Sequence, residues 1–187
     1  MNARDDALLA EGHRRALALR RQRVTALNAT LADWFGGQTD LTLGIGCGHG
    51  HYLTAYAEHH PAEACLGVDL VTRRIDKALA KRDKRHLSHL HFVKADAWEC
   101  LEALPETIAL RRIFVLFPDP WPKKRHEKNR LLQHSLLQAL ANRAHPGATL
   151  HFRTDHVELS EWGLEQLETH PCWQVQASSP WPFEAGS

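Results

Sequence analysis

A segment that joins an acidic corner to a cluster of positive charges lies in the second half of the 187-residue chain. Residues 117–131 read FPDPWPKKRHEKNRL, with Asp119 held between two prolines and followed by Trp121. The cations that follow are Lys123, Lys124, Arg125, His126, Lys128 and Arg130. Prolines restrict the backbone, so the acid keeps one place while the cations attract a polyanion. We expect residues 117–131, called the lip below, to border an active site.

Four closely spaced glycines form a second candidate site. The stretch LGIGCGHGHYL, residues 43–53, contains Gly44, Gly46, Gly48 and Gly50. Glycine lets a ligand approach the backbone, although a plain strand-to-helix turn explains the pattern equally well. Asp69, about twenty residues later, favours ligand binding because an acid there can bond ribose hydroxyls. His51 replaces the third glycine of GxGxxG, so we expect Gly44, Gly46, Gly48 and Asp69 to bind S-adenosyl-L-methionine rather than a nicotinamide dinucleotide.

Two further acids directly follow apolar runs. Asp96 can accept a hydrogen bond from an adenine amine while Ala97 leaves room for the ring. Asp96 can equally cap the short helix expected after it, and both roles are compatible. Asp155, preceded by Thr154, follows a later run, and its alternative role is to cap a helix over residues 156–169.

The elements that position these residues alternate between strands and helices. We expect strands at 41–45, 65–70, 89–94, 112–117, 148–153 and 173–176, and helices at 3–35, 51–60, 72–85, 97–104, 129–143 and 156–169. This alternation is typical of an α/β fold with a mostly parallel sheet and helices on both faces. Ligands of such sheets bind at the carboxyl ends of the strands, where the glycine loop and four aspartates fall.

The composition fits one globular domain, in which a helical segment over residues 1–36 precedes a main domain over 37–187. The net charge of +1 means that any attraction for nucleic acid must come from local clusters. The arginines of the first helix could form a solvated face or contact RNA. Because the four cysteines lack zinc-ligand spacing, we expect no metal and a reduced, cytoplasmic protein. We expect no signal peptide and no membrane span.

The motifs GIGCGHG, GVDL, ADA, FPDPWPKKRHEKNRL and HPGATLHFRTD together resemble the tRNA (guanine-N7)-methyltransferase family over residues 41–155. The resemblance implies a Rossmann-like, S-adenosyl-L-methionine-dependent methyltransferase fold and an enzyme that methylates N7 of a guanine in tRNA. The family's cofactor acids correspond to Asp69, Asp96 and Asp119. Its RNA-side residues correspond to Lys123, Arg125, His126, Arg130, Thr154 and Asp155.

This chemistry needs little acid–base help. Guanine N7 carries an exposed lone pair, so no proton must leave before it attacks a sulfonium methyl group. The ring gains positive charge, which a carboxylate of Asp119 or Asp155 would stabilise. Most of the rate should come from alignment of the reacting atoms. We therefore expect Asp119 and Asp155 to be the catalytic residues and the site to be poor in histidine bases.

Three positions depart from the family pattern. Gly44 stands where the family has an acid, which removes one charged cofactor contact, and Asn129 replaces an arginine that contacts phosphate. The chain ends at SSPWPFEAGS, so we expect the last strand to be missing. The exposed edge of strand five would then favour a homodimer or be covered by the tail. These departures leave a non-catalytic RNA- or cofactor-binding relative as the main alternative; a nicotinamide-dependent oxidoreductase and a small-molecule methyltransferase are the others.

Overall fold

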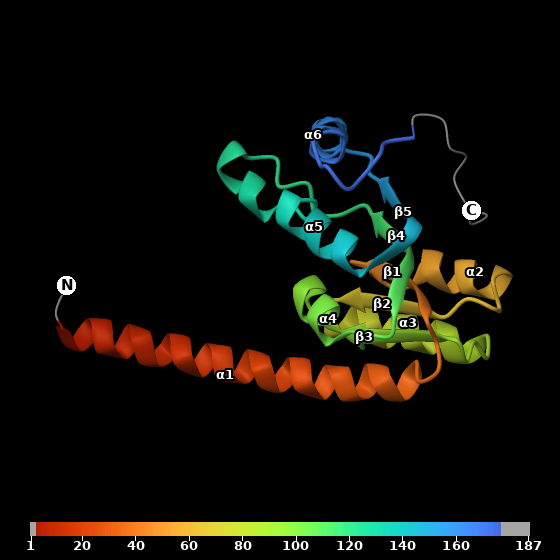
Figure 1. Cartoon of the computed structure of the whole chain (residues 1–187), viewed down its shortest axis with the longest axis horizontal. Helices are drawn as coiled ribbons and strands as arrows, with labels where there is room; N and C mark the ends of the chain where they lie inside the picture. The colour runs from red at the N-terminus through yellow and green to blue at the C-terminus, as the bar shows by residue number, and fades with distance from the viewer. Residues whose placement is uncertain (1–2, 177–187) are drawn as a thin grey trace.

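The computed structural model describes the backbone of residues 3–176, and the side chains from Glu11 onward except that of Lys124. Helices and strands alternate along this part of the chain (Figure 1). The strands are β1 (Asp40–Ile45), β2 (Cys65–Asp69), β3 (Leu90–Lys94), β4 (Ala109–Leu116) and β5 (Ala144–Arg153). The helices are α1 (Ala3–Trp34), α2 (His51–His59), α3 (Thr72–Lys84), α4 (Ala97–Ala103), the 3-10 helix η1 (Lys124–Asn129), α5 (His134–Arg143) and α6 (Val157–Glu168).

The strands form one sheet in the order β3-β2-β1-β4-β5, and all four pairings are parallel. The chain moves outward from β1 to β3, then returns to the other side of β1 with β4. This reversal opens a crevice at the carboxyl ends of β1 and β4, which is where ligands bind in such sheets. The predicted α/β fold with a mostly parallel sheet is therefore confirmed.

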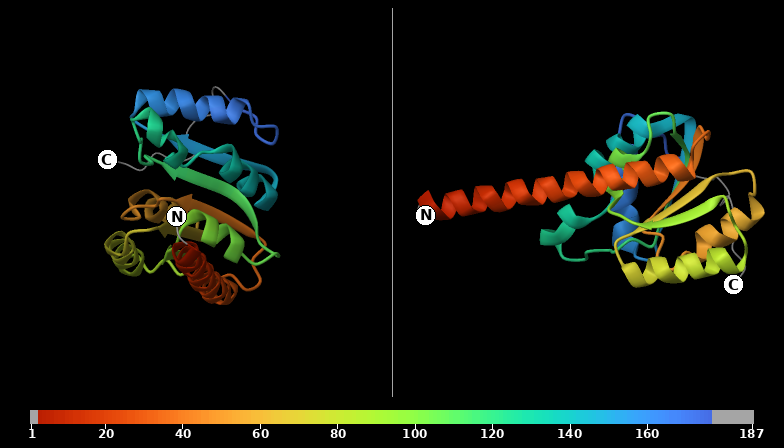
Figure 2. Two further views of the ribbon diagram at one scale, coloured as in Figure 1. Left: turned by 90° about the vertical axis from the view of Figure 1, so that its left-hand side faces the viewer. Right: turned by 90° about the horizontal axis from the view of Figure 1, so that it is seen from below.

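Helices cover both faces of the sheet (Figure 2). One core contains Leu31 of α1 and Leu136 of α5 together with residues of α4, and the other contains Tyr56 of α2 and Ala78 of α3. Strands covered on both faces can be apolar along their whole length, which is why β1 and β2 read as continuous apolar runs. Each fully buried large side chain stabilises the fold by about 1.5–3 kcal/mol. The two cores therefore hold the sheet whose strand ends form the crevice.

The last part of α1 packs into the main core through Leu27 and Leu31, and Phe35 joins that core directly after the helix. Its preceding turns lie against α4, where Arg23 bonds Glu99 and the Asn28 side chain donates to the Ala103 carbonyl over 2.8 Å. The N-terminal part of α1 extends well beyond the rest of the molecule (Figures 1 and 2).

Two predicted elements are corrected. Residues 173–176 do not form a strand, because Trp173 instead packs against α5 and its ring N–H donates to the Leu137 carbonyl over 3.0 Å. The helix expected over 129–143 begins only at His134, after η1. The Gln133 side chain donates to the carbonyls of Glu127 and Arg130, which therefore have a partner without a continuing helix.

The last strand, β5, pairs only with β4 within the described part of the chain. It contains a bulge, since the register to β4 jumps between Ala144 and Thr149. The predicted tail after Gln176 lies outside the described residues, so the expectation about this edge stays a prediction. No helix in the described range is both long and apolar enough to cross a membrane.

Candidate active site

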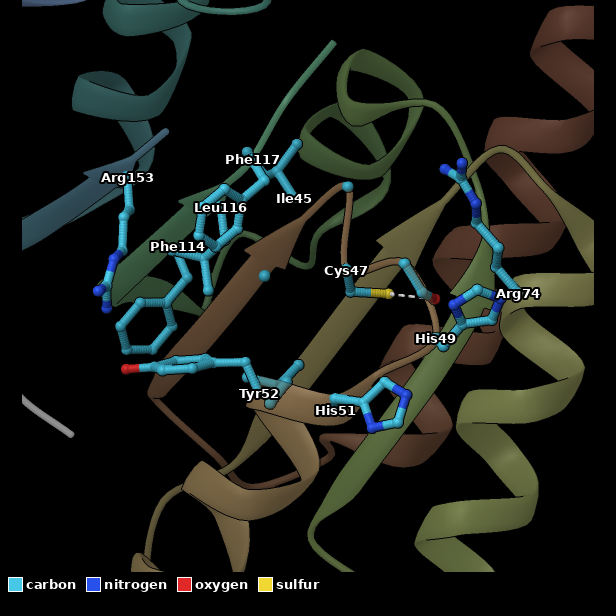
Figure 3. A pocket seen from close by; sticks show the side chains of 14 residues that line it. Ile45, Cys47, His49, His51, Tyr52, Arg74, Phe114, Leu116, Phe117 and Arg153 are labelled. Atoms are coloured by element: carbon cyan, nitrogen blue, oxygen red, sulfur yellow. Dashed lines mark hydrogen bonds between the residues drawn. The ribbon is translucent and has the colours of Figure 1, made fainter. Parts of the chain in front are cut away.

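A cavity of about 440 Å³ opens at the carboxyl ends of β1 and β4 (Figure 3). Its wall includes the glycine loop, the start of α2 and the end of β4. The residues that line it are Gly44, Ile45, Gly46, Cys47, Gly48, His49, His51, Tyr52, Leu53, Arg74, Phe114, Leu116, Phe117 and Arg153. In Figure 3 the rings of Tyr52 and Phe114 stand together on one side, and His49 and Arg74 on the other. An aromatic wall opposite a polar one suits a ligand with a flat ring and charged groups.

The glycine loop presents bare backbone to this cavity. Gly46 and Gly48 have φ angles of 65° and 57°, a conformation that side chains disfavour. A Cβ atom built on either would meet no heavy atom within 4 Å, so the space in front of both is open. Gly50 differs, because its Cβ would come within 2.7 Å of the Ala78 side chain. Gly46 and Gly48 therefore allow a ligand close to the chain, while Gly50 serves the packing of α2 on α3.

Asp69 fixes the shape of the loop. Its carboxylate is 5% exposed and accepts the N–H of Gly48 over 3.0 Å and the N–H of Val71 over 2.8 Å. Arg74 of α3 lies 3.5 Å from the same carboxylate. Each carboxylate oxygen has a second lone pair, so Asp69 can hold the loop and still accept a hydroxyl. The open glycine backbone and this acid fit an S-adenosyl-L-methionine site.

Gly44 lines the cavity at the end of β1, as predicted for a cofactor-side position. A Cβ atom there would lie 3.2 Å from a methyl carbon of Leu53. An acid at this position would need Leu53 to move by a few tenths of an ångström. Leu53 thus packs close to the place that an acidic side chain at position 44 would begin to fill.

Asp96 caps α4, since its side chain accepts the N–H of Trp98 over 2.8 Å. The capping alternative is therefore confirmed. Ala97 is buried in the core, 8% exposed. Neither residue is among those that line the cavity. Their predicted contact with an adenine ring remains a prediction.

The lip turns sharply at two residues. Phe117 and Trp121 have φ angles of 49° and 42°, which large side chains rarely adopt. The N–H of Phe117 donates to the Arg153 carbonyl over 2.7 Å, so the end of β5 holds the corner. Asp119 lies between the two turns with its side chain exposed. Phe117 and Arg153 line the cavity but Asp119 does not, so its predicted cofactor contact and catalytic role remain predictions.

The predicted RNA-side residues fall into two groups. Lys123 and Arg125 are exposed. The ring of His126 is half-buried and meets Trp121 edge-on at 5.6 Å. This arrangement makes Trp121 partly a packing residue, and it leaves the two long cations free to reach outward.

Arg130 is only 5% exposed, unlike Lys123, Arg125 and Lys128 of the lip, which are exposed. Its guanidinium donates to the Pro120 carbonyl over 3.2 Å and lies 5.1 Å from the ring centre of Trp162 in α6. Glu127 also lies 3.7 Å away. Arg130 therefore holds the lip against α6, a position that does not present it to a phosphate in solution.

Asp155 is exposed, and the structure contradicts its alternative role as a helix cap. The capping residue of α6 is His156, whose ring nitrogen accepts the N–H of Leu159 over 3.4 Å. The half-buried Thr154 accepts the N–H of His156 over 3.1 Å. The carboxylate of Asp155 is thus available beside the end of β5.

His49 and His51 both line the cavity, which the sequence reasoning did not anticipate, while the expectation that the site lacks a histidine base stays a prediction. Desolvation, followed by the positive charges of α3, lowers the pKa of each below the ordinary 6.5. Both rings are therefore neutral at neutral pH. Burial, with the charge of Asp69, raises the pKa of the Cys47 thiol to about 12, so Cys47 is no nucleophile.

Sequence reasoning also missed Tyr52, Arg74, Phe114 and Arg153. Tyr52 and Arg74 each lie in the first turn of a helix expected after a predicted strand, so that position could have pointed to them. Phe114 and Arg153 lie on neighbouring strands, and only the sheet order brings them to one wall.

The chain matches known methyltransferases by sequence and by fold. A family model described as "Putative methyltransferase" matches residues 38–184. A tRNA (guanine-N(7)-)-methyltransferase of Magnetococcus marinus is 34% identical over 97% of this chain and 72% of its own length. A tRNA (guanine-N(7)-)-methyltransferase of Alkalilimnicola ehrlichii is 37% identical over 73% of this chain but 58% of its own length.

The solved precorrin-6y C5,15-methyltransferase of Geobacter metallireducens GS-15 superposes with a TM-score of 0.56 at 16% identity, covering 77% of this chain and 69% of its own. This likeness concerns the fold. In the relatives from Alkalilimnicola ehrlichii and Mycobacterium avium, this chain spans 58% and 49% of their length, about half.

Proposed function

The chain belongs to the tRNA (guanine-N7)-methyltransferase family, and from this premise we propose that it transfers a methyl group from S-adenosyl-L-methionine to N7 of a guanine in tRNA. One observation carries the proposal. The open glycine cradle, braced by Asp69, and the rigid lip with its outward cations meet at the same end of the sheet. A small charged cofactor suits the first feature and a polyanionic substrate suits the second.

The cofactor would be held by the backbone at Gly46 and Gly48 and by the Asp69 carboxylate. When bound, it supplies an electrophilic methyl group on a sulfonium. The rings of Tyr52 and Phe114, with centres 5.0 Å apart, offer an apolar wall that excludes water. Arg74, 3.5 Å from the Asp69 carboxylate, adds a positive charge beside the loop.

The nucleophile needs no base, because N7 loses no proton when its lone pair forms the new bond. Neutral His49 and His51 are consistent with this chemistry, since neither must accept a proton. The N7-methylated guanine is positively charged, and the exposed carboxylates of Asp119 and Asp155 would stabilise that charge. Lys123 and Arg125 would contact phosphates and give binding that weakens with salt. A tRNA substrate would be consistent with the cytoplasmic location that we expect for the protein.

Mass spectrometry of tRNA nucleosides tests the proposal after incubation with S-adenosyl-L-methionine. We expect 7-methylguanosine from the wild type and a loss of at least about a hundredfold in rate, the size of one charge-stabilising group, from Asp119→Asn. Asp33→Asn changes an exposed aspartate of α1 in the same way and should keep full activity. Wild-type protein that binds S-adenosylhomocysteine but forms no 7-methylguanosine would support the non-catalytic alternative.

A further inference from the structure

The N-terminal part of α1 leaves the molecule on the same side as the cavity. α1 has 32 residues, about 48 Å of helix, whereas the six residues of β1 span about 20 Å. Its C-terminus at Trp34 leads to the amino end of β1 at Asp40. The helix therefore runs alongside the sheet in the opposite direction to β1. Its N-terminal part extends far beyond the carboxyl ends of the strands. Figures 1 and 2 show this part of α1 and the η1 segment leaving the sheet on one side.

This projecting part is strongly basic. Residues 11–23, EGHRRALALRRQR, contain five arginines and one glutamate. The acids Asp5 and Asp6 lie nearer the start of the helix. Every side chain from Glu11 to Leu19 is exposed. Since the whole chain has a net charge of only +1, this is a local concentration of charge.

The arginines have different surroundings. Arg20 pairs with Glu102 at 2.6 Å and Arg23 with Glu99, both in α4. These two pairs fasten α1 to the body. Arg14, Arg15 and Arg21 have no ion pair among the side chains described from Glu11 to Gln176. Arg14 and Arg21 are seven residues apart, so they share one side of the helix at a spacing of about 10.5 Å.

The segment offers little to an apolar partner. Among its described side chains, from Glu11 onward, the large exposed apolar ones are Leu17 and Leu19, 41% and 48% exposed. Residues two apart point to different sides of a helix, so these leucines form no stripe. Exposed arginines on a helix that shows no apolar stripe over residues 11–23 are suited to phosphate oxygens.

We propose that the projecting part of α1 is a second RNA-binding surface, at which Arg14 and Arg21 contact the phosphate backbone of the RNA whose guanine enters the cavity. The inference rests on the proposed function for its ligand. It assigns the RNA a position between α1 and the lip, with cations on both sides. The contact lies outside the reacting atoms, so it should govern binding and leave the chemical step unchanged.

Binding of tRNA to the full-length chain, measured over a series of salt concentrations, tests this surface. Each phosphate contact contributes about 0.7–0.9 to the slope of log affinity against log salt. Arg14→Gln/Arg21→Gln should therefore reduce the slope by about 1.5 and weaken binding about tenfold at 0.1 M salt. Arg14→Lys/Arg21→Lys should keep the wild-type slope. The matched control, Lys84→Gln/Arg85→Gln, removes two exposed charges at the far end of α3 and should bind like wild type.

Turnover in the same preparations separates this inference from the proposed function. For the double glutamine variant, KM for tRNA should rise while kcat stays at the wild-type value. A wild type that methylates tRNA beside a double variant with unchanged affinity and slope would overturn the surface and leave the function standing. If the wild type forms no 7-methylguanosine but the double glutamine variant binds tRNA more weakly than the wild type, the proposed function is overturned and the RNA-binding surface stands. Arginine-dependent binding to phosphatidylserine vesicles with unchanged tRNA binding would also overturn the surface, in favour of a membrane.

Discussion

Replacing Asp69 by asparagine tests whether this one side chain holds the glycine loop. Its two carboxylate oxygens accept one backbone N–H each, from Gly48 and from Val71. Asparagine offers one acceptor oxygen and one NH₂ group, so one of the two backbone donors would face another donor. A lost bond to a charged acceptor costs about 1.5–3 kcal/mol. Arg74 adds little, because it is about half exposed at 47%.

The change should lower the melting temperature by about 3–12 °C, since 1 kcal/mol shifts a domain of this size by about 2–4 °C. It should also weaken S-adenosylhomocysteine binding by about tenfold or more, the equivalent of about 1.4 kcal/mol, in calorimetry well below the melting temperature.

The control is Asp96→Asn, the same substitution at an aspartate that accepts a single N–H, from Trp98. Asparagine caps helices as well as aspartate does, so the melting temperature should change by less than about 2 °C. On this reasoning, the number of hydrogen bonds that an aspartate accepts decides how much stability its replacement costs. Equal shifts in melting temperature for the two variants, or a shift below about 2 °C for Asp69→Asn, would refute it.

Four further predictions concern parts of the chain outside the loop. Arg130→Ala removes a buried donor to the lip and a cation–π contact, so it should cost about 2–4 kcal/mol in urea unfolding, while Lys128→Ala, an exposed neighbour, should cost almost nothing. Burial lowers the pKa of His151 from 6.5 to about 4, so on acidification the unfolded chain takes up this proton before the folded one. The contribution of His151 to stability is therefore full above pH 6.5 and falls toward pH 4. Between pH 7 and pH 5 the melting temperature of His151→Asn should fall by less than that of the wild type. Ellman's reagent at pH 8 should find one fast thiol, the exposed Cys172, because burial raises the pKa of the other three to about 12; two fast thiols would contradict this. If the β5 edge mediates a dimer, Thr149→Lys should reduce the mass seen by light scattering, whereas a concentration-independent wild-type monomer would rule the dimer out.

The fold could be predicted from the sequence because buried parallel strands leave a strong pattern. The first four apolar runs match β1 to β4, since strands covered on both faces are mostly apolar. Asp69 could be predicted because its place depends on one strand end and one loop, which are close in the sequence. The run Trp173–Gln176 has the same alternation of apolar and polar residues as a strand, but its tryptophan packs on α5 instead.

The site was harder to predict where a residue's surroundings come from segments that are distant in the sequence. Arg130 lies in a run of cations, which indicates a solvated segment, yet Trp162 and the Pro120 carbonyl bury it. No local signal distinguishes it from Lys128. His156 rather than Asp155 caps α6, because a difference of one residue in where the helix begins changes which residue is the cap.

The two left-handed residues of the lip, Phe117 and Trp121, imply a trade-off for directed evolution. Each large side chain at a positive φ costs about 1–2 kcal/mol, which glycine would recover. Selection for heat resistance alone should therefore enrich glycine at both positions. Phe117→Gly would at the same time remove a wall of the cavity and free the corner that carries Asp119. A library screened only for survival at high temperature should thus yield more stable proteins in which the proposed methyl transfer is slower.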